Sequence, residues 1–564
     1  MTNLEIAELL RAAAAAYQLK DAAKNKFRII AYQRAADAVE HLSSEVKDVW
    51  DEGKLDDIPG IGESLASHLD EIFKTGRSKH FNALMKGLPP KMFELLPVPG
   101  IGPKTAFKLA KSGEIPAEVK TSLKKLKERP HRLLLPYAMT IADEVITWMK
   151  KEKAVSGIEA LGSLRRRAST IGDIDIAAAT TDSQKTLIHF TKYPKAKKIS
   201  EKGETTASII LPGDIQVDLM VQSPEAYGAL LQHFTGSKHH NIALREYALK
   251  RDLSLSEYGI KSKGKLEKFA SEETFYRKLG MEWIPPELRE DVGEIEAATD
   301  RNLPELVELK DIKADLQIHS DFDIETSHDL GVSSMEEIIK EAGSLGYEYI
   351  AFTEHNPSQS GHNEKQILEI LKRKKEKIEK LNSSIVKKGE ANATLRVKKV
   401  FNSLEVDILP NGKLALPEAA LDLLDFVLVS VHSSFGLSRA EMTKRVLTAL
   451  SYPKVKIFAH PTARKINQRE GIEVNWPEVF AACKSKNIWL EINADPMRLD
   501  LPDFLIKEAI EHGVKLTLGT DAHHKDGLKN MEYGIFTARR GWAEKKDIIN
   551  TKDLVDFEKM ISKA

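Results

Sequence analysis

Gly-Ser-Leu-Arg-Arg at residues 162–166 and Gly-Asp-Ile-Asp at residues 172–175 decide how this chain of 564 residues is interpreted. If the second stretch belongs to a strand, the alternation of side chains puts Asp173 and Asp175 on one face. Two adjacent carboxylates repel each other unless a cation lies between them, and Mg²⁺ binds one or two carboxylates together with substrate phosphates. A Gly-Ser turn that leads into a helix offers amides and a hydroxyl to phosphate oxygens. The pattern therefore predicts metal-assisted nucleotidyl transfer.

A third carboxylate, Asp218, lies in an alternating segment further along the chain. The apolar residues at positions 215, 217 and 219 face one way and Asp218 faces the other. Its strand is able to lie beside the strand that carries the first two carboxylates, although a lone aspartate in a strand usually faces solvent. The segment His-Phe-Thr-Gly-Ser follows at residues 233–237, and Asn241 and Arg245 come after it at helical spacing.

Composition indicates a soluble protein without disulfides. Lysine and arginine total 84, as do aspartate and glutamate, so the overall charge argues neither for nor against a nucleic-acid partner. The single cysteine, Cys483, excludes an intramolecular disulfide framework and suits a reducing cytoplasm. The N-terminus lacks the basic and apolar regions of a signal peptide, and the alanine run at residues 12–16 is too short to span a bilayer. We expect a cytoplasmic monomer with no membrane partner.

Two copies of an apolar-Pro-Gly-apolar-Gly turn lie at residues 58–62 and 98–102, each followed by a helical pattern. Such a turn exposes consecutive amides at a helix N-terminus, where a phosphate can bind. It resembles the helix-hairpin-helix module, which grips the DNA backbone without reading bases. A tight turn that needs glycine is the alternative for one copy, but two copies near Lys104 and Lys108 favour DNA. The predicted contacts here are Gly60, Gly62, Gly100, Gly102 and Lys104.

The segments between residues 162 and 245 together resemble a family X DNA polymerase, the group that contains polymerase beta. The family pattern is a Gly-Ser-x-Arg-Arg turn, an Asp-x-Asp strand, a third Asp, and Tyr-Phe-Thr-Gly-Ser followed by Asn and Arg. The elements occur here in that order, with His233 in place of the tyrosine. The resemblance implies that Mg²⁺ or Mn²⁺ is held by Asp173, Asp175 and Asp218. It also implies that the substrates are dNTPs and gapped or primer-template DNA.

The resemblance assigns further roles around the three carboxylates. Arg245 would contact the template strand, and His233 predicts looser discrimination at the sugar. A monovalent cation is expected at the helix-hairpin-helix turns. The lysine that forms the Schiff base in the family's deoxyribose-phosphate lyase falls at His68, which cannot act as an amine nucleophile, so we expect weak or absent lyase activity. The residues implied to bind the nucleotide are Arg132, Gly162, Ser163, Arg166, Gly172, Phe234, Thr235, Gly236 and Asn241.

After residue 312 the pattern changes to apolar strands, most of them followed by a helix, which predicts a parallel sheet or barrel. The expected strands are residues 314–318, 349–353, 400–406, 426–431, 456–459, 488–492 and 515–519. Histidines and carboxylates follow these strands, at the end where β/α barrels collect their active sites. One such histidine alone is best explained by packing, but five beside carboxylates predict a centre for Zn²⁺, Mn²⁺ or Fe²⁺.

These motifs resemble the polymerase-and-histidinol-phosphatase (PHP) domain, a distorted barrel that holds three metals and hydrolyses phosphoesters. Two positions depart from its pattern, because Gln317 replaces the first histidine of His-x-His and Ile324 replaces the usual aspartate. Asp323 or Glu325 would then supply the missing ligand after a shift of one residue, and His328 or Asp329 lies in a short insertion. The resemblance implies up to three Zn²⁺ or Mn²⁺ ions, held by His319, Asp323, His355, Glu405, His432, His460, Asp521 and His523.

We therefore predict a multidomain protein of α+β and α/β class. The expected parts are a helical DNA-binding domain with the first hairpin (1–85), a fingers-like helical domain with the second (86–150), a polymerase beta-like nucleotidyltransferase palm (151–225), a thumb-like nucleotide-selection domain (226–295), a linker (296–312) and a PHP domain (313–564).

The predicted function is filling of short DNA gaps in repair, with metal-dependent 3′–5′ exonuclease or 3′-end phosphoesterase activity from the C-terminal half. The alternative keeps the polymerase and makes the PHP domain a catalytically weak structural or DNA-binding platform. A DNA-end-binding scaffold without catalysis would require all three palm carboxylates to be incidental.

Overall fold

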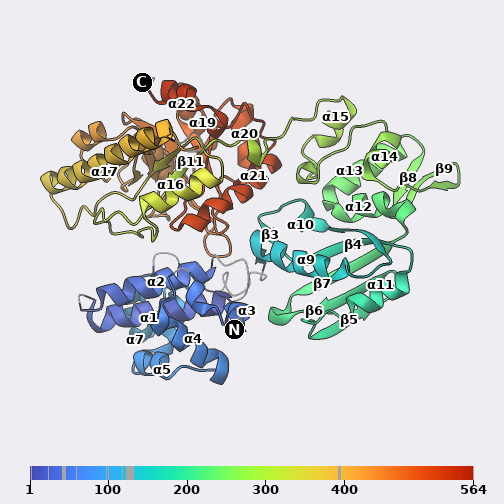
Figure 1. Ribbon diagram of the computed structural model, residues 1–564, viewed down its shortest axis with the longest axis horizontal. Coiled ribbons are helices and arrows are strands. Elements are labelled where there is room, and N and C mark those ends of the chain that lie inside the picture. The colour runs from blue at the N-terminus through green and yellow to red at the C-terminus, as the bar shows by residue number, and fades with distance from the viewer. Residues whose placement is uncertain are drawn as a thin grey trace. The chain divides into compact units, whose positions relative to one another are not determined.

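The computed structural model describes residues 1–562 apart from positions 2, 23, 41–45, 52, 59, 97, 99–100, 117–118, 122, 124–131 and 392–395. The chain divides into two compact units. One contains residues 1–130, 307–538 and 543–564, and the other contains residues 131–306 together with residues 539–542. Figure 1 shows the elements along the chain. No helix among the described residues is long and apolar enough to cross a membrane.

The N-terminal part is helical, as the sequence predicts. Its helices are α1 (Asn3–Asp21), α2 (Lys26–Glu40), α3 (Val46–Asp51), α4 (Glu63–Thr75), α5 (Lys79–Met85), α6 (Pro90–Leu95) and α7 (Pro103–Ser112). Buried residues of α1, α2, α4 and α5 form one core, and α6 and α7 form a second core with Ala15 of α1. Each hairpin turn leads directly into a helix, because Gly62 caps α4 and Gly102 caps α7.

The palm is a five-stranded sheet in the order β2-β4-β7-β6-β5. Its strands are β2 (Val155–Ala160), β4 (Ile174–Thr180), β5 (Lys198–Lys202), β6 (Thr206–Ile210) and β7 (Gln216–Gln222). Strands β4 and β7 are parallel neighbours, whereas the other pairs are antiparallel. Helices α9 (Leu135–Met149) and α11 (Ser183–Phe190) contact this sheet, and α12 (Tyr227–Thr235) packs on Ala177 and Ala179 of β4.

The stretch at residues 172–175 is only partly in a strand, because β4 begins at Ile174. Ile171 belongs to β3 (Thr170–Ile171), which pairs with β1 (Leu133–Leu134) in a small separate sheet. Asp173 therefore lies in the connection that precedes β4, and only Asp175 is in the strand. The division has a physical cause, since the backbone of Ile171 is engaged by Leu133 rather than by the palm sheet.

The thumb follows the palm and has its own core. It consists of α12, α13 (Lys238–Leu249), β8 (Leu253–Ser256), β9 (Gly259–Ser262), β10 (Lys265–Glu267), α14 (Glu272–Lys278) and α15 (Glu294–Thr299). Leu244, Phe275, Tyr276 and Ile295 are buried in this core. Trp542 packs against the same cluster. This contact agrees with the assignment of residues 539–542 to the unit that contains residues 131–306.

The C-terminal region contains two parallel sheets. The first is β11 (Ala314–Ile318), β12 (Tyr349–Phe352) and β13 (Lys399–Asn402); the second is β14 (Glu405–Asp407), β15 (Val427–Ser430), β16 (Val455–Phe458), β17 (Trp489–Asn493) and β18 (Leu516–Gly519). Single parallel bridges, His355 to Glu405 and Ile318 to Ala522, connect residues at the ends of these sheets. The topology is thus two parallel sheets linked by single bridges, and the parallel pairing agrees with the sheet or barrel that the sequence predicted.

The break between the sheets falls within the expected strand 400–406, at Ser403 and Leu404. The Ser403 carbonyl accepts a hydrogen bond from the buried ammonium of Lys374, which also donates to Phe352 O at 3.0 Å. Lys374 belongs to α17 (Glu364–Ala391), a long helix beside β13. Lys374 thus ties the end of β12 to the segment between β13 and β14.

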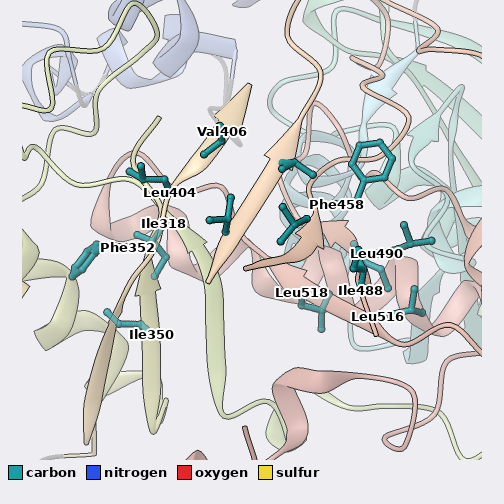
Figure 2. Packing of buried hydrophobic residues seen from close by; sticks show 14 of the residues in the cluster. Ile318, Ile350, Phe352, Leu404, Val406, Phe458, Ile488, Leu490, Leu516 and Leu518 are labelled. Atoms are coloured by element: carbon teal, nitrogen blue, oxygen red, sulfur yellow. The ribbon is translucent and has the colours of Figure 1, made fainter. Parts of the chain in front are cut away.

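Both faces of the C-terminal strands are buried, as in parallel sheets covered by helices. Ile350 and Phe352 of β12 join one cluster, and Tyr349 and Ala351 join another. Figure 2 shows residues of the first cluster, contributed by β11, β12, β14, β16, β17 and β18. The second cluster includes Phe557 of α22 (Leu554–Ser562). These cores fix the strand ends from which the site residues project.

Candidate active sites

Two palm carboxylates face each other across neighbouring strands. In the parallel pair β4 and β7, Asp175 is the direct partner of Asp218. Burial first, and then the charges of Asp173 and Asp218, raise the pKa of Asp175 to about 7. A buried carboxylate whose pKa is raised by two neighbouring carboxylates favours a bound cation. In the part of the chain that the structure describes, they do not form a group of three ligand atoms within 4.8 Å.

The glycine of the Gly-Ser turn is required by the closeness of Asp175. Gly162 has φ +58°, and a Cβ atom there would lie 2.7 Å from Asp175 Oδ2. The backbone N–H of Leu161 donates to Asp175 O at 2.7 Å, which fixes the turn to β4. Helix α10 (Gly162–Arg165) is a single turn, and Ser163 directly follows the glycine that approaches Asp175.

Arg166 and the residues predicted to line the sugar are in contact. Arg166 Nη1 donates to Thr235 O at 2.5 Å, and Arg166 Nε lies 3.0 Å from Glu290 Oε1. A Cβ atom on Gly236, which has φ +68°, would lie 3.0 Å from Arg166 Nη1. Arg165, which was not predicted to be a site residue, donates to Thr235 Oγ1 at 2.7 Å and pairs with the buried Glu272. The turn and the end of α12 are therefore held together by two arginines.

A second arginine of the predicted nucleotide site lies beside its glycine. Arg132 donates to Thr170 Oγ1 and Thr170 O, both at 2.8 Å. A Cβ atom on Gly172 would lie 3.0 Å from Arg132 Nη1. Gly172, which directly precedes Asp173, thus leaves room for the guanidinium of Arg132.

The remaining predicted nucleotide and DNA residues lie on or near α13. Asn241 donates to His233 O at 2.7 Å and accepts from Gln232 at 2.9 Å, so its amide is held against the end of α12. The ring of Phe234 is half-buried and contacts the ring of His233. Arg245 is exposed on α13.

The hairpin glycines differ in conformation. Gly60 has φ +83°, whereas Gly62 and Gly102 have extended backbone and open space around a would-be Cβ atom. Lys104 is exposed at the second position of α7. Gly100 lies outside the described residues, so its predicted DNA contact has no structural account here.

Seven of the eight predicted PHP ligands converge at the ends of the C-terminal strands. Glu405 is the centre, with Oε1 lying 2.7 Å from His460 Nε2 and 3.2 Å from His432 Nε2. His319 Nε2 lies 3.3 Å from Glu405 Oε2 and 3.1 Å from Asp521 Oδ1. Ligand atoms within 4.8 Å of one another form four groups: His319-His355-His523, His328-His355-His432, Glu405-His432-His460 and His319-Glu405-Asp521.

The electrostatics of this cluster favour cations. Burial alone raises the pKa of Glu405, but the imidazoles of His355, His460 and His432 hold that pKa well below its usual range. Burial lowers the pKa of His319, yet the carboxylates of Asp521 and Glu405 raise it to about 10. Positive charge beside these carboxylates is therefore favoured, and a bound cation would supply it.

Several buried ring nitrogens of the cluster lack a hydrogen-bond partner: His355 Nδ1, His460 Nδ1 and His523 Nε2. His523 donates from Nδ1 to Asp521 O at 2.8 Å, which leaves its Nε2 with the lone pair. Buried polar atoms are normally satisfied. Unpaired imidazole nitrogens beside carboxylates match the ligand preferences of Zn²⁺ and Mn²⁺, so the residues present fit divalent ions.

The two departures from the PHP pattern have different outcomes. Gln317 donates to Glu405 Oε2 at 2.9 Å, so it holds the central carboxylate. Asp323 is exposed, accepts from the backbone of Glu325 at 3.0 Å, and joins none of the four ligand groups. Glu325 instead pairs with His362 at 2.8 Å. The cause is Ile324, which is buried in the core and directs both neighbouring carboxylates away from the cluster.

The structure adds residues that the sequence did not single out as ligands. Arg498 is buried, and its Nε lies 3.4 Å from Asp521 Oδ2, while Nε and Nη1 have no hydrogen-bond partner. Asp407 accepts from His328 Nε2 and from His432 Nδ1, both at 2.7 Å. A signal for Asp407 was present, since alternation places it on the face of Glu405 in β14. Arg498 follows β17 just as the recognised motifs follow their strands.

Two family models match parts of the chain, the helix-hairpin-helix domain at residues 1–78 and the DNA polymerase beta thumb at residues 230–290. The chain is 28% identical over 231 residues to a probable phosphatase of Thermoanaerobacter sp. (strain X514), which covers 39% of this chain and 84% of that protein. It is 26% identical over 296 residues to DNA polymerase lambda of Rattus norvegicus, which covers 46% of this chain and 49% of that protein.

A further relative can be aligned with this chain over its whole length. The chain is 32% identical over 594 aligned residues to the DNA polymerase/3′-5′ exonuclease PolX of Bacillus subtilis (strain 168), and the alignment covers 100% of both chains. This relative, together with the polymerase beta thumb and the phosphatase similarity, confirms the resemblance stated from the motifs. The chain therefore belongs to the family X DNA polymerases with a C-terminal PHP domain.

Proposed function

We propose that this polymerase fills short gaps during DNA repair by two-metal nucleotidyl transfer at Asp173, Asp175 and Asp218. The observation that carries the proposal is the direct pairing of Asp175 with Asp218 on parallel strands, together with the raised pKa of Asp175. Divalent ions bound there would neutralise phosphate charge and lower the barrier to attack by the primer hydroxyl. The helix-hairpin-helix match supports contact with the DNA backbone.

The neighbouring residues have defined tasks in this proposal. Ser163 and the amides of the Gly162 turn bind phosphate oxygens, and Arg166 and Arg132 neutralise the triphosphate. Thr235 is positioned by both arginines of the turn, which supports a rigid surface against the sugar. Preorganised donors and cations of this kind stabilise the transition state more than the ground state.

The palm proposal is tested by single-nucleotide extension of a primer at a one-nucleotide gap. Asp175→Asn and Asp218→Ala are each expected to reduce kcat by at least about a hundredfold, since losing one electrostatic contributor typically costs on this order. Glu201→Gln, an exposed carboxylate on β5 of the same sheet, is the matched control and should extend normally. Normal extension by Asp218→Ala would refute the assignment.

For the C-terminal half we propose metal-dependent hydrolysis of phosphoesters at DNA 3′ ends, as exonuclease or 3′-phosphatase. The carboxylate-imidazole cluster around Glu405 supports the metal requirement. Arg498 supports the substrate class, because its buried and unpartnered Nη1 would be satisfied by a phosphate oxygen. Arginine is the side chain best matched to phosphate in geometry and charge.

This second activity is separable from synthesis. Asp173→Ala protein is incubated with 3′-labelled DNA and Mn²⁺, and the products distinguish nucleoside monophosphate from inorganic phosphate. Release is expected, and adding Glu405→Gln in the same chain should abolish it. No release with Mg²⁺, Mn²⁺ or Zn²⁺ would instead favour a catalytically weak platform.

A further inference from the structure

His328 lies among the PHP ligands although it belongs to the insertion between β11 and α16 (Met335–Ser344). Its ring centre is 4.7 Å from that of His355 and 5.0 Å from that of His432. One nitrogen of each of the three rings lies within 4.8 Å of one nitrogen of each of the others. Three imidazoles from three separate segments therefore meet at one point of the cluster.

Asp407 orients two of these three rings. Its Oδ2 accepts from His328 Nε2 and its Oδ1 accepts from His432 Nδ1, each at 2.7 Å. Histidines that bind metals usually donate their other ring N–H to a carboxylate in this way, which sets the tautomer. With one proton directed at Asp407, each ring keeps a lone pair on its opposite nitrogen.

The third ring, that of His355, has a nitrogen available to bind a metal ion. His355 is buried, and its Nδ1 has no hydrogen-bond partner, with Glu405 Oε2 the nearest acidic atom at 3.6 Å. A buried imidazole nitrogen without a partner is unusual unless an unseen group satisfies it. The position where the PHP pattern carries an aspartate offers no replacement, because Ile324 is apolar and buried.

We propose that His328 is a metal ligand and that, with His355 and His432, it forms a nitrogen-rich position that prefers Zn²⁺ to Mg²⁺. Imidazole ligands suit Zn²⁺, whereas Mg²⁺ requires oxygen ligands. The insertion thus supplies an imidazole in place of the missing carboxylate. The inference deepens the proposed phosphoesterase function, but bound metal rather than turnover decides it.

The test counts Zn²⁺ bound to the purified full-length chain after equilibrium dialysis, by mass spectrometry of the metal, without DNA. His328→Gln removes the imidazole while leaving an amide donor for Asp407, and it is expected to bind about one ion fewer per chain than wild type. His362→Gln changes a histidine of the same region that lies outside the four ligand groups, and it should bind as many ions as wild type.

A spectroscopic readout separates a ligand from a residue that only positions Asp407. In Co²⁺-substituted protein, loss of a nitrogen ligand changes the visible absorption, whereas loss of an outer hydrogen bond weakens affinity about 10-fold to 100-fold without removing an ion. An unchanged ion count in His328→Gln, with or without weaker affinity, would overturn the inference while leaving the phosphoesterase proposal intact. If wild type itself bound no metal at the PHP residues, both would fail.

Discussion

At the residue scale, the Asp175 carboxyl should release a measurable proton when a metal ion binds to the palm. Its pKa is raised to about 7 by burial and by the charges of Asp173 and Asp218. Below that pH the carboxyl is protonated without metal, so binding of Mg²⁺ must release the proton. We expect close to one proton released per chain from this group at pH 6 and almost none at pH 9, measured by calorimetry in buffers of different ionisation enthalpy.

The matched comparison uses Asp175→Asn and Glu201→Gln. The first should lose the palm's contribution to proton release at pH 6, and the second should retain it. Release that is equal in wild type and Asp175→Asn would show that this carboxyl is already ionised in the absence of metal.

His68 bears on a second activity of the family. Its ring stacks on His80 with centres 4.1 Å apart, and burial lowers the pKa of both imidazoles. Tyr17 and Tyr32 hydroxyls each lie 3.1 Å from His80 Nε2. Because no amine is present at position 68, we expect no borohydride-trapped adduct with a 5′-deoxyribose-phosphate end. Trapping comparable to that of a lyase-proficient relative would contradict this.

Residues in regular strands, and ligands that directly follow a strand, were predictable, whereas residues further into the loops were not. The pairing of Asp175 with Asp218 follows from period-two alternation in two neighbouring strands. His328 and Arg498 lie in irregular segments, where no period relates sequence position to direction. The same limit explains Asp323, since nothing in the sequence showed that Ile324 would be the residue that turns inward.

At the scale of elements, helix α7 presents its first turn to any bound backbone. Lys104 is exposed there, and a lysine that neutralises one phosphate contributes to the salt dependence of binding. Lys104→Ala is expected to lower the slope of log K against log salt by about 1, equally for unrelated DNA sequences. Lys91→Ala on α6 is the control, because that lysine lies 3.5 Å from Glu94 and is not in a hairpin. Equal slopes for Lys104→Ala and wild type would exclude the contact.

Helix α17 stabilises the strand ends through Lys374. This fully buried ammonium lies 2.7 Å from Glu354 Oε2, next to the ligand His355. Lys374→Met leaves the Glu354 charge buried and unpaired, which is expected to cost about 3–5 kcal/mol. Hydrogen exchange of β12 and β13 should report the loss, and adding Glu354→Gln should recover part of it. Unchanged exchange in Lys374→Met would show that the ion pair is dispensable.

The strands themselves illustrate what a pattern can predict about elements. Each expected C-terminal strand is present within a residue or two, because apolar runs bounded by turns mark buried strands. The sequence did not predict the division of residues 400–406 into β13 and β14, nor the contact of Ser403 with Lys374, which lies 29 residues earlier. Long-range contacts of this kind leave no local signal.

At the scale of the whole molecule, four residues of the C-terminal region belong to the polymerase unit. Arg540 Nη1 donates to Arg166 O at 2.8 Å and lies 3.0 Å from Glu290 Oε1, while Arg539 pairs with Glu287 at 2.8 Å. Because Arg166 also pairs with Glu290, Arg540 helps to position a residue proposed to bind the triphosphate.

Arg540→Ala is therefore expected to raise KM for the incoming dNTP several-fold more than it lowers kcat, since it acts on binding. Single-nucleotide insertion at saturating DNA measures both constants. Lys546→Ala, an exposed lysine a few residues further on, should leave both unchanged. A KM equal to that of wild type would show that Glu290 and the Thr235 carbonyl position Arg166 without help from Arg540.

The segment at residues 539–542 also determines how this enzyme can be taken apart. The chain passes from one unit to the other at residues 306–307, returns at 538–539 and leaves again at 542–543. Trimming the gene after residue 306 would therefore remove Trp542 from the thumb core and leave a gap in its place. A shortened polymerase that ends at residue 306 would therefore need another side chain to fill the place of Trp542 in the thumb core.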